Sequence, residues 1–411
     1  MFIQAMVINL TPLFFIPLRE QFGLSFEQLG RLVLVNFVTQ MVMDVACTMA
    51  VDRIGAVKAL TVAAQALAAA GLWLFAGAAM LFPNEPYNGL VLGTIVFSMG
   101  CGLLEVLVSP IINAVPSGRK ESDMALLHAF YPIGKVAVIG VTALALAFFG
   151  NGAWNWIALA WSIVPLVNLF GFLAVKLPPF VHESQREKTR TMARTGFFWL
   201  ALAGIFLAGA AEVTFAQWTS AFAQAALGMS QFVGDAIGFG LFGVTMVIGR
   251  LWFGLHGGQV GLRGSLIVGG LLSALCYAVV GLSPWPWVSL AACVFAGFSV
   301  SMLWPGMVSL SASAFPRAGI SLFALLAAFG DTGAGLMPWL VGLTADAGEK
   351  ARQAGVPFLP ALFPGSLDPV QAGLRAGMLL AALAPALLVV VVLAMRGPFR
   401  ASAMLPVSKS S

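Results

Sequence analysis

Charged residues are scarce in this sequence. Only 9% of its 411 residues are Asp, Glu, Lys or Arg, whereas 60% are hydrophobic, and the mean hydropathy is +0.95. Soluble domains carry about 25% charged residues, so this composition excludes a water-soluble fold. The net charge of +5 is scattered over short segments instead of gathering on one face, and we therefore expect no nucleic-acid partner.

Cysteine and histidine are also rare. Cys47, Cys101, Cys276 and Cys293 lie inside apolar runs without paired spacing, so we expect neither a disulfide framework nor a metal site. The three histidines lie on separate segments, and the sequence has no HExxH motif, nucleophile elbow or phosphate-binding glycine loop. We predict that the chain is not an enzyme, needs no cofactor and has no ATP site.

Long apolar runs fill most of the chain instead. A bilayer core about 30 Å thick needs roughly 20 apolar residues per helix, and backbone groups in lipid must bond within the helix. The runs and their loop signals predict twelve transmembrane helices, at 2–18, 30–50, 59–82, 89–115, 123–149, 154–175, 196–222, 231–255, 264–282, 286–314, 318–345 and 373–396. The predicted fold class is an all-α membrane protein with the lipid bilayer as its solvent.

Basic residues are unevenly divided between the two sides of these helices. The even-numbered connections and the tail carry Arg53, Lys58, Arg119, Lys120, Lys176, Arg186, Lys188, Arg190, Arg194, Arg263, Arg317, Arg396, Arg400 and Lys409. The opposite side carries Arg19, Arg31, Lys350, Arg352 and Arg375. By the positive-inside rule, we predict a multi-pass protein of the plasma or inner membrane with both termini in the cytoplasm.

The two halves of the chain resemble each other. Ala129–Gly134 (AFYPIG) is similar to Ala328–Gly333 (AFGDTG), and Pro110 and Pro305 occupy similar depths in the fourth and tenth spans. Such repeats are typical of transporters with a site at the midplane between the halves. The predicted organisation is an N-terminal six-helix bundle at 1–175, a cytoplasmic linker at 176–195, and a C-terminal six-helix bundle at 196–411 that includes an external loop at 346–372 and a short tail.

Polar side chains recur inside the predicted spans at helical spacing. Asn36, Gln40 and Asp44 share one face of the second span, and we expect that face to line a cavity because polar groups at membrane depth are costly. The other candidates for binding a solute or a proton are Glu105, Asn113, His128, Tyr131, Lys135, Glu212, Gln217, Trp218, Trp304 and Asp331.

Lys135 raises the question of a partner. Its charge requires a carboxylate at this depth, and Glu105 and Asp44 are the candidates. Two interpretations stay open, a static ion pair that holds helices together and a group coupled to protons or solute. Amides and acids hydrogen-bond to hydroxyl groups and aromatic faces stack on sugar rings, so the number of converging groups favours a polar solute. For Trp218 and Trp304, ordinary helix packing is an equal alternative.

The loop after the second span resembles a signature of the major facilitator superfamily. TMAVDRIGAVKAL matches its acid–arginine pair, glycine and basic position with Asp52, Arg53, Gly55 and Lys58. A second copy, GRLWFGLHGGQVGLRGSL, contains Arg250. The resemblance extends over nearly the whole chain and implies two pseudo-symmetric six-helix bundles. It also implies a charged latch at the cytoplasmic side that favours the outward-facing state.

Five further segments are most similar to the fucose:proton-symporter-like branch of sugar permeases. They are GLLEVLVSPIIN, LLHAFYPIG, GAAEVTFAQWTSAF, LWPGMVSLSA and FGDTGAGLMPWLVGLTAD. In that branch a glutamate of the fourth span lies near the substrate and proton site, and Glu105 matches it. The first-span aspartate of fucose permeases has no equivalent, because Pro12 stands about there with Asn9 nearby.

The resemblance implies a secondary transporter that moves a sugar or similar small polar solute by alternating access with protons, acting as a monomer. An exporter of drugs or organic anions on the same fold is the alternative, and Lys135 and Arg250 would favour anions. A transporter-like sensor or a membrane enzyme is a remote alternative.

Overall fold

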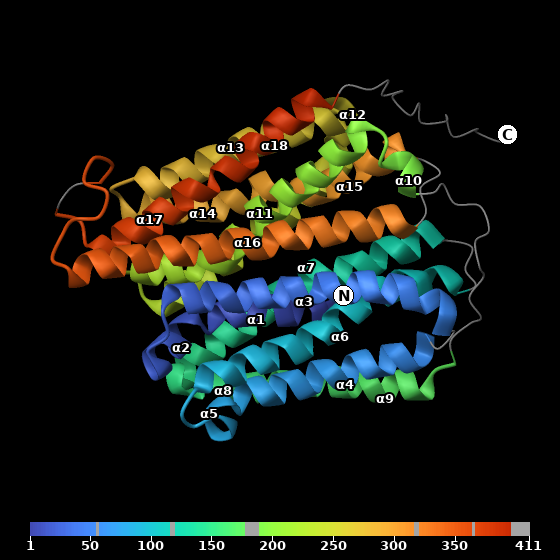
Figure 1. Ribbon diagram of the computed structural model, residues 1–411, viewed down its shortest axis with the longest axis horizontal. Helices are drawn as coiled ribbons and strands as arrows, with labels where there is room; N and C mark the ends of the chain where they lie inside the picture. Colours follow the sequence, from blue (N-terminus) through green and yellow to red (C-terminus); the bar gives the residue numbers. More distant parts are fainter. Residues whose placement is uncertain (55–56, 116–119, 177–188, 316–319, 364–365, 396–411) are drawn as a thin grey trace.

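The computed structural model describes residues 1–54, 57–115, 120–176, 189–315, 320–363 and 366–395, and its regular elements are helices (Figure 1). The first half contains α1 (Phe2–Leu13), α2 (Phe15–Phe22), α3 (Phe26–Ile54), α4 (Val57–Ala76), α5 (Ala78–Leu81), α6 (Pro86–Ala114), α7 (Lys120–Phe149), η1 (Asn151–Ala153), α8 (Trp154–Trp161) and α9 (Ile163–Ala174). After α10 (Thr189–Met192), the second half contains α11 (Gly196–Ala225), η2 (Val233–Gly240), α12 (Leu241–Val260), α13 (Leu262–Leu282), α14 (Pro286–Val300), α15 (Leu303–Ala314), α16 (Ile320–Gln353), α17 (Pro369–Ala381) and α18 (Leu383–Ala394).

These helices form twelve spans. In the described ranges, ten segments are long and apolar enough to cross a bilayer, and the bent pair α1–α2 makes an eleventh. The twelfth is α7, whose apolar part Ile133–Phe149 is shorter. The predicted fold class, an all-α membrane protein with twelve transmembrane helices, is therefore confirmed.

The structure changes the shape of one predicted span and the length of another. The first span is not one straight helix at 2–18, because α1 and α2 meet at an angle of 47°. The eleventh span does not end at 345, because α16 continues to Gln353. Lys350 and Arg352 lie in its last turn, where positive charge stabilises the helix end, so polar composition alone did not mark the boundary.

The helices of each half lie together. In Figure 1 the first-half helices, blue to green, lie below the second-half helices, green to red, and α16 runs beside α3 where the halves meet. We call the end where α9 stops and α10 begins the linker end, at the right of Figure 1. We call the other end, where α2 stops, the Arg19 end.

Prolines inside the spans free backbone acceptors at membrane depth. A helical proline has no N–H to donate to the carbonyl four residues earlier. Pro12 thereby leaves the Ile8 carbonyl available, and Pro305 does the same for Ser301, where α14 and α15 are separated. In lipid such a group must find another donor. Both carbonyls are used by polar side chains of the site described below.

Gly333 sets how closely α16 and α11 pack within the second half. A Cβ atom at this position would lie 1.9 Å from the Phe206 carbonyl oxygen, so any side chain forces the two backbones apart. We expect Gly333→Val to lower the yield of folded protein severalfold, measured by fluorescence-detected size-exclusion chromatography. Gly171→Val is the matched control, since nothing lies within 4 Å of its Cβ position. Equal yields from the two variants would contradict this packing argument.

Candidate functional site

Three carboxyl groups meet where the two halves touch. Asp44 of α3, Glu105 of α6 and Asp331 of α16 each place a carboxylate oxygen within 4.8 Å of the others. Asp44 and Asp331 are 1% and 4% exposed. Three negative charges at this separation in a dry environment repel strongly, so the cluster must hold at least one proton or a cation. We call these three residues the acidic cluster.

Gln4 of α1 is hydrogen-bonded to Glu105. Its Nε2 donates a 2.7 Å hydrogen bond to Glu105 Oε2, and its side chain is buried. The amide side chains of the second span, Asn36 and Gln40, lie on the same helix face as Asp44 but form hydrogen bonds with each other. Gln40 Nε2 donates to Asn36 Oδ1 at 2.9 Å, and Ser98 Oγ of α6 donates to the same oxygen at 2.6 Å. This stripe of α3 is therefore tied to α6, with Asp44 at its end next to the second half.

A second group of charged residues also lies where the two halves meet. Arg250 Nη2 of α12 is 3.6 Å from Glu212 Oε1 of α11, and Arg250 Nε donates at 3.3 Å to the Ser301 carbonyl freed by Pro305. Lys135 of α7 approaches from the first half and is 4% exposed. We call Lys135, Glu212 and Arg250 the basic group, since it contains two cations and one carboxylate.

The predicted partners of Lys135 were wrong. The carboxylate that acts on its charge is Glu212, from the other half, and not Glu105 or Asp44. The Lys135 Nζ atom lies 4.8 Å from the ring centroid of Phe242 and 5.7 Å from that of Phe239. The ammonium group is thus held against aromatic faces, which attract a cation without neutralising it.

Tyr131 connects the two groups. It lies one turn before Lys135 on α7, and the charges that act on its hydroxyl group are those of Glu212, Arg250 and Glu105. A solute in contact with Tyr131 is therefore within electrostatic reach of both the basic group and the acidic cluster.

Gln217 and Trp218 of α11 bind backbone carbonyls rather than pointing into open space. Gln217 Nε2 donates at 3.1 Å to the Ile8 carbonyl freed by Pro12, which links the second half to the first. Trp218 Nε1 donates at 2.9 Å to the Pro338 carbonyl, and its fully buried ring meets Phe15 edge to face at 5.4 Å. Both residues hold helices together in the structure.

Trp304 also packs against backbone. Its ring atoms lie within 3 Å of the Cβ positions that side chains at Gly330 and Gly209 would need. Among the latch residues, Lys58 Nζ donates at 2.8 Å to the Leu173 carbonyl near the end of α9, within the first half. Arg250, predicted for the second copy of the latch, lies in the basic group. The remaining predicted residues lie outside the described side chains: Asp52, Arg53, Gly55, Asn113 and His128.

The Arg19 end is closed by contacts between the halves. Asp346 of α16 accepts hydrogen bonds from the backbone N–H groups of Phe26 at 2.8 Å and Glu27 at 3.1 Å, so it caps α3 from the opposite half. Trp339 Nε1 donates to Glu27 Oε1 at 2.6 Å. The sequence placed Asp346 in a loop and missed this role. An acid about two turns before the end of its own helix gives no signal that it caps another helix.

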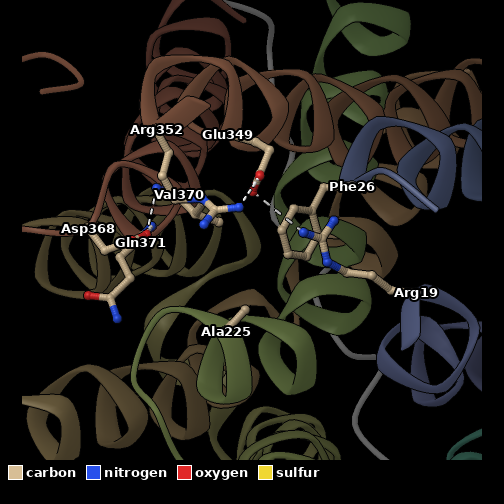
Figure 2. A pocket seen from close by; sticks show the side chains of 8 residues that line it. All are labelled: Arg19, Phe26, Ala225, Glu349, Arg352, Asp368, Val370 and Gln371. Carbon is tan, nitrogen blue, oxygen red and sulfur yellow. Dashed lines mark hydrogen bonds and ion pairs between the residues drawn. The ribbon is translucent and has the colours of Figure 1, made fainter. Parts of the chain in front are cut away.

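A pocket lies beside these contacts and is lined in part by Phe26. Figure 2 shows Glu349 between Arg19 and Arg352, with Asp368 at the start of α17 across the pocket. Arg19 Nη2 is 3.6 Å from Glu349 Oε2, and Asp368 accepts from the N–H groups of Val370 and Gln371. The pocket has a volume of about 340 Å³. Arg19 and Arg352 both pair with Glu349, and Asp368 caps α17, so we assign the pocket to the closed end and not to the site.

A buried acid near the Arg19 end was also missed. Asp235 is fully buried in η2, a π-helical segment, and accepts a hydrogen bond from Ser220 of α11. Gln4, Ser301 and the two phenylalanines beside Lys135 were missed as well. Gln4 and Asp235 carry the same signal as the residues that were chosen, a polar side chain in an apolar run, whereas the others carry none.

The sequence model of the Major Facilitator Superfamily matches residues 1–338. This chain belongs to that superfamily. A sequence search of curated proteins gave no match. Among solved structures, a bacterial homologue of the human lysosomal transporter spinster, in an inward-facing and occupied conformation, aligns with a TM-score of 0.75 and 16% identity over 96% of this chain and 93% of its own.

Two sugar symporters have the same fold as this major facilitator protein. The E. coli fucose:proton symporter aligns with a TM-score of 0.62 and 15% identity over 96% of each chain. The D-xylose-proton symporter aligns with a TM-score of 0.69 and 16% identity over 93% of this chain and 94% of its own. The predicted resemblance to the superfamily is confirmed, and at these identities the structural neighbours establish the fold alone.

Proposed function

We propose that this major facilitator protein is a secondary transporter that moves a sugar or similar small polar solute together with protons by alternating access. The acidic cluster is the observation that carries this proposal. Asp44 and Glu105 come from one half and Asp331 from the other, so a change in the contact between the halves changes the repulsion among the three carboxyl groups. Proton uptake by the cluster is therefore coupled to the arrangement of the halves.

The contacts between the halves indicate which side of the membrane the site faces in this structure. The hydrogen bonds of Asp346 and Trp339 close the Arg19 end, while the acidic cluster lies nearer the linker end. With both termini in the cytoplasm, as we predict from the basic residues, the closed Arg19 end faces the outside, which fits an inward-facing state. The spinster homologue with the same fold was solved in an inward-facing conformation. We propose that the protein acts as a monomer in a plasma or inner membrane.

Solute uptake into proteoliposomes tests the proposal. The purified full chain is reconstituted, and accumulation of radiolabelled neutral sugars and sugar acids is measured with and without an inwardly directed proton gradient. We expect at least one solute to accumulate above its external concentration only when the gradient is present. Uptake that ignores the gradient would contradict proton coupling, and failure of every solute would contradict the proposed substrate class.

A further inference from the structure

The basic group carries an uncompensated positive charge. Arg250 is paired with Glu212, so Lys135 has no carboxylate of its own in this group. Within the described residues its side chain forms no hydrogen bond or ion pair, and its contacts are the rings of Phe239 and Phe242. A buried cation beside aromatic rings is stabilised but remains charged, and in a low-dielectric site that charge attracts an anion.

The acidic cluster does not supply this anion. Its three carboxyl groups act on one another, and Glu105 is further bound by Gln4. The charges that act on Lys135 are instead those of Glu212 and Arg250, which belong to the second half. The site therefore has two electrically different ends, one acidic and one with an excess of one positive charge.

The basic group bridges the two halves. Lys135 belongs to α7, while Glu212 and Arg250 belong to α11 and α12. The helix α7 packs on the second half near Lys135, since the Cβ position of Gly243 lies 3.6 Å from Val136. An anion between Lys135 and Arg250 would contact both halves. A solute held in this way stabilises one arrangement of the halves over another, as a transported solute must.

The chemistry of the two cations indicates the kind of anion. A guanidinium group presents a planar pair of donors that matches a carboxylate, and an ammonium group adds a point charge. Arg250 is not saturated, since its ion pair with Glu212 is long at 3.6 Å and its side chain is 32% exposed. Tyr131 feels the charges of Glu212, Arg250 and Glu105, so hydroxyl groups of a solute beside Tyr131 would lie within reach of both groups.

We infer that the transported solute is an organic anion of sugar size with one carboxylate, such as a sugar acid. Its carboxylate binds Arg250 and Lys135, and its hydroxyl groups extend past Tyr131 towards the acidic cluster. This inference rests on the function proposed above and specifies its substrate class.

Matched pairs of solutes test the inference. Proteoliposomes with the full chain are given radiolabelled glucuronate or glucose, and galacturonate or galactose, under the same inward proton gradient. We expect an acid to enter at least about tenfold faster than its neutral partner, because the neutral sugar leaves the cation unpaired. Uptake of the neutral sugars without the acids would overturn the inference and leave the proposed transport function intact. Uptake of neither class would overturn both.

Variants then locate the binding site. Lys135→Gln and Arg250→Gln are each expected to raise the half-saturating concentration of the acid about tenfold or more, whereas Lys135→Arg retains the charge and most of the affinity. Arg263→Gln is the control, since Arg263 donates to the Val392 and Leu393 carbonyls, away from the site. Size-exclusion profiles verify folding. Unchanged acid uptake by Lys135→Gln, or equal loss in the folded Lys135→Arg variant, would overturn the site.

Discussion

Glu105→Gln abolishes proton-driven accumulation of the solute while exchange of solute across the membrane continues, if the acidic cluster carries the coupled proton. The amide has the shape of the acid and still accepts the hydrogen bond from Gln4, but it cannot gain or lose a proton. We expect the ratio of internal to external solute to fall to about one under an imposed proton gradient, because a transporter without coupling only equilibrates its solute. Counterflow of labelled solute in preloaded proteoliposomes measures the exchange that remains.

The same experiment distinguishes the members of the cluster. Asp331→Asn removes the carboxyl group contributed by the second half, and Asp44→Asn removes the second one from the first half. Each is expected to weaken coupling, since the repulsion that forces proton binding decreases with every charge removed. Glu85→Gln is the matched control, because Glu85 is exposed and its side chain makes no cap hydrogen bond. Full proton-driven accumulation by the Glu105 variant would assign the proton to another group.

Gly342→Val prevents closure of the Arg19 end. A Cβ atom at Gly342 would lie 2.4 Å from the Phe26 carbonyl oxygen, across the contact between α16 and α3. The branched side chain fits only if the two helices separate, which also breaks the hydrogen bonds from Phe26 and Glu27 to Asp346. We expect transport to fall at least about tenfold, since overpacking of this kind costs roughly 1–3 kcal/mol and, in the proposed alternating-access cycle, acts on one state only.

The rate at which a buried cysteine is labelled measures the opening of the Arg19 end directly. A cysteine at Gln217, next to the first half, is buried in the closed arrangement. In Gly342→Val it should react several times faster with a membrane-impermeant maleimide added from the Arg19 side. Gly140→Val should leave the reaction unchanged, because nothing lies within 4 Å of the Gly140 Cβ position. Unchanged labelling in Gly342→Val would mean that the contact between α16 and α3 at Gly342 does not close the Arg19 end.

The acidic cluster shows how far sequence reasoning reaches. All three of its residues were identified from the sequence, because a carboxyl group in an apolar run is expensive and therefore conspicuous. Their meeting was not predicted, since Asp331 lies far along the chain from the other two and helical periodicity relates only residues on one helix. The prediction of the partner of Lys135 was wrong for the same reason. Helical spacing identified the lysine, but only the packing of α7 against the second half placed it within reach of Glu212 of α11 instead of Glu105 and Asp44.

The prolines also show which features can be predicted from the sequence and which depend on the packing of helices. Pro12 and Pro305 could be read from the sequence as positions where a carbonyl loses its helical donor. Gln217 and Arg250 could be read as polar groups in need of partners. Only the packing of α1 on α11, and of α12 on α14, brought each donor to its acceptor.

Composition along the chain was enough to predict the all-helical membrane fold, the twelve spans and the polar groups inside them, because hydrophobicity and backbone hydrogen bonding in lipid depend on local sequence. The tertiary structure decided which of those groups meet. It also decided that Asp346 and Trp339 close one end of the bundle, because close approach between helices depends on the shapes of surfaces that are remote in sequence.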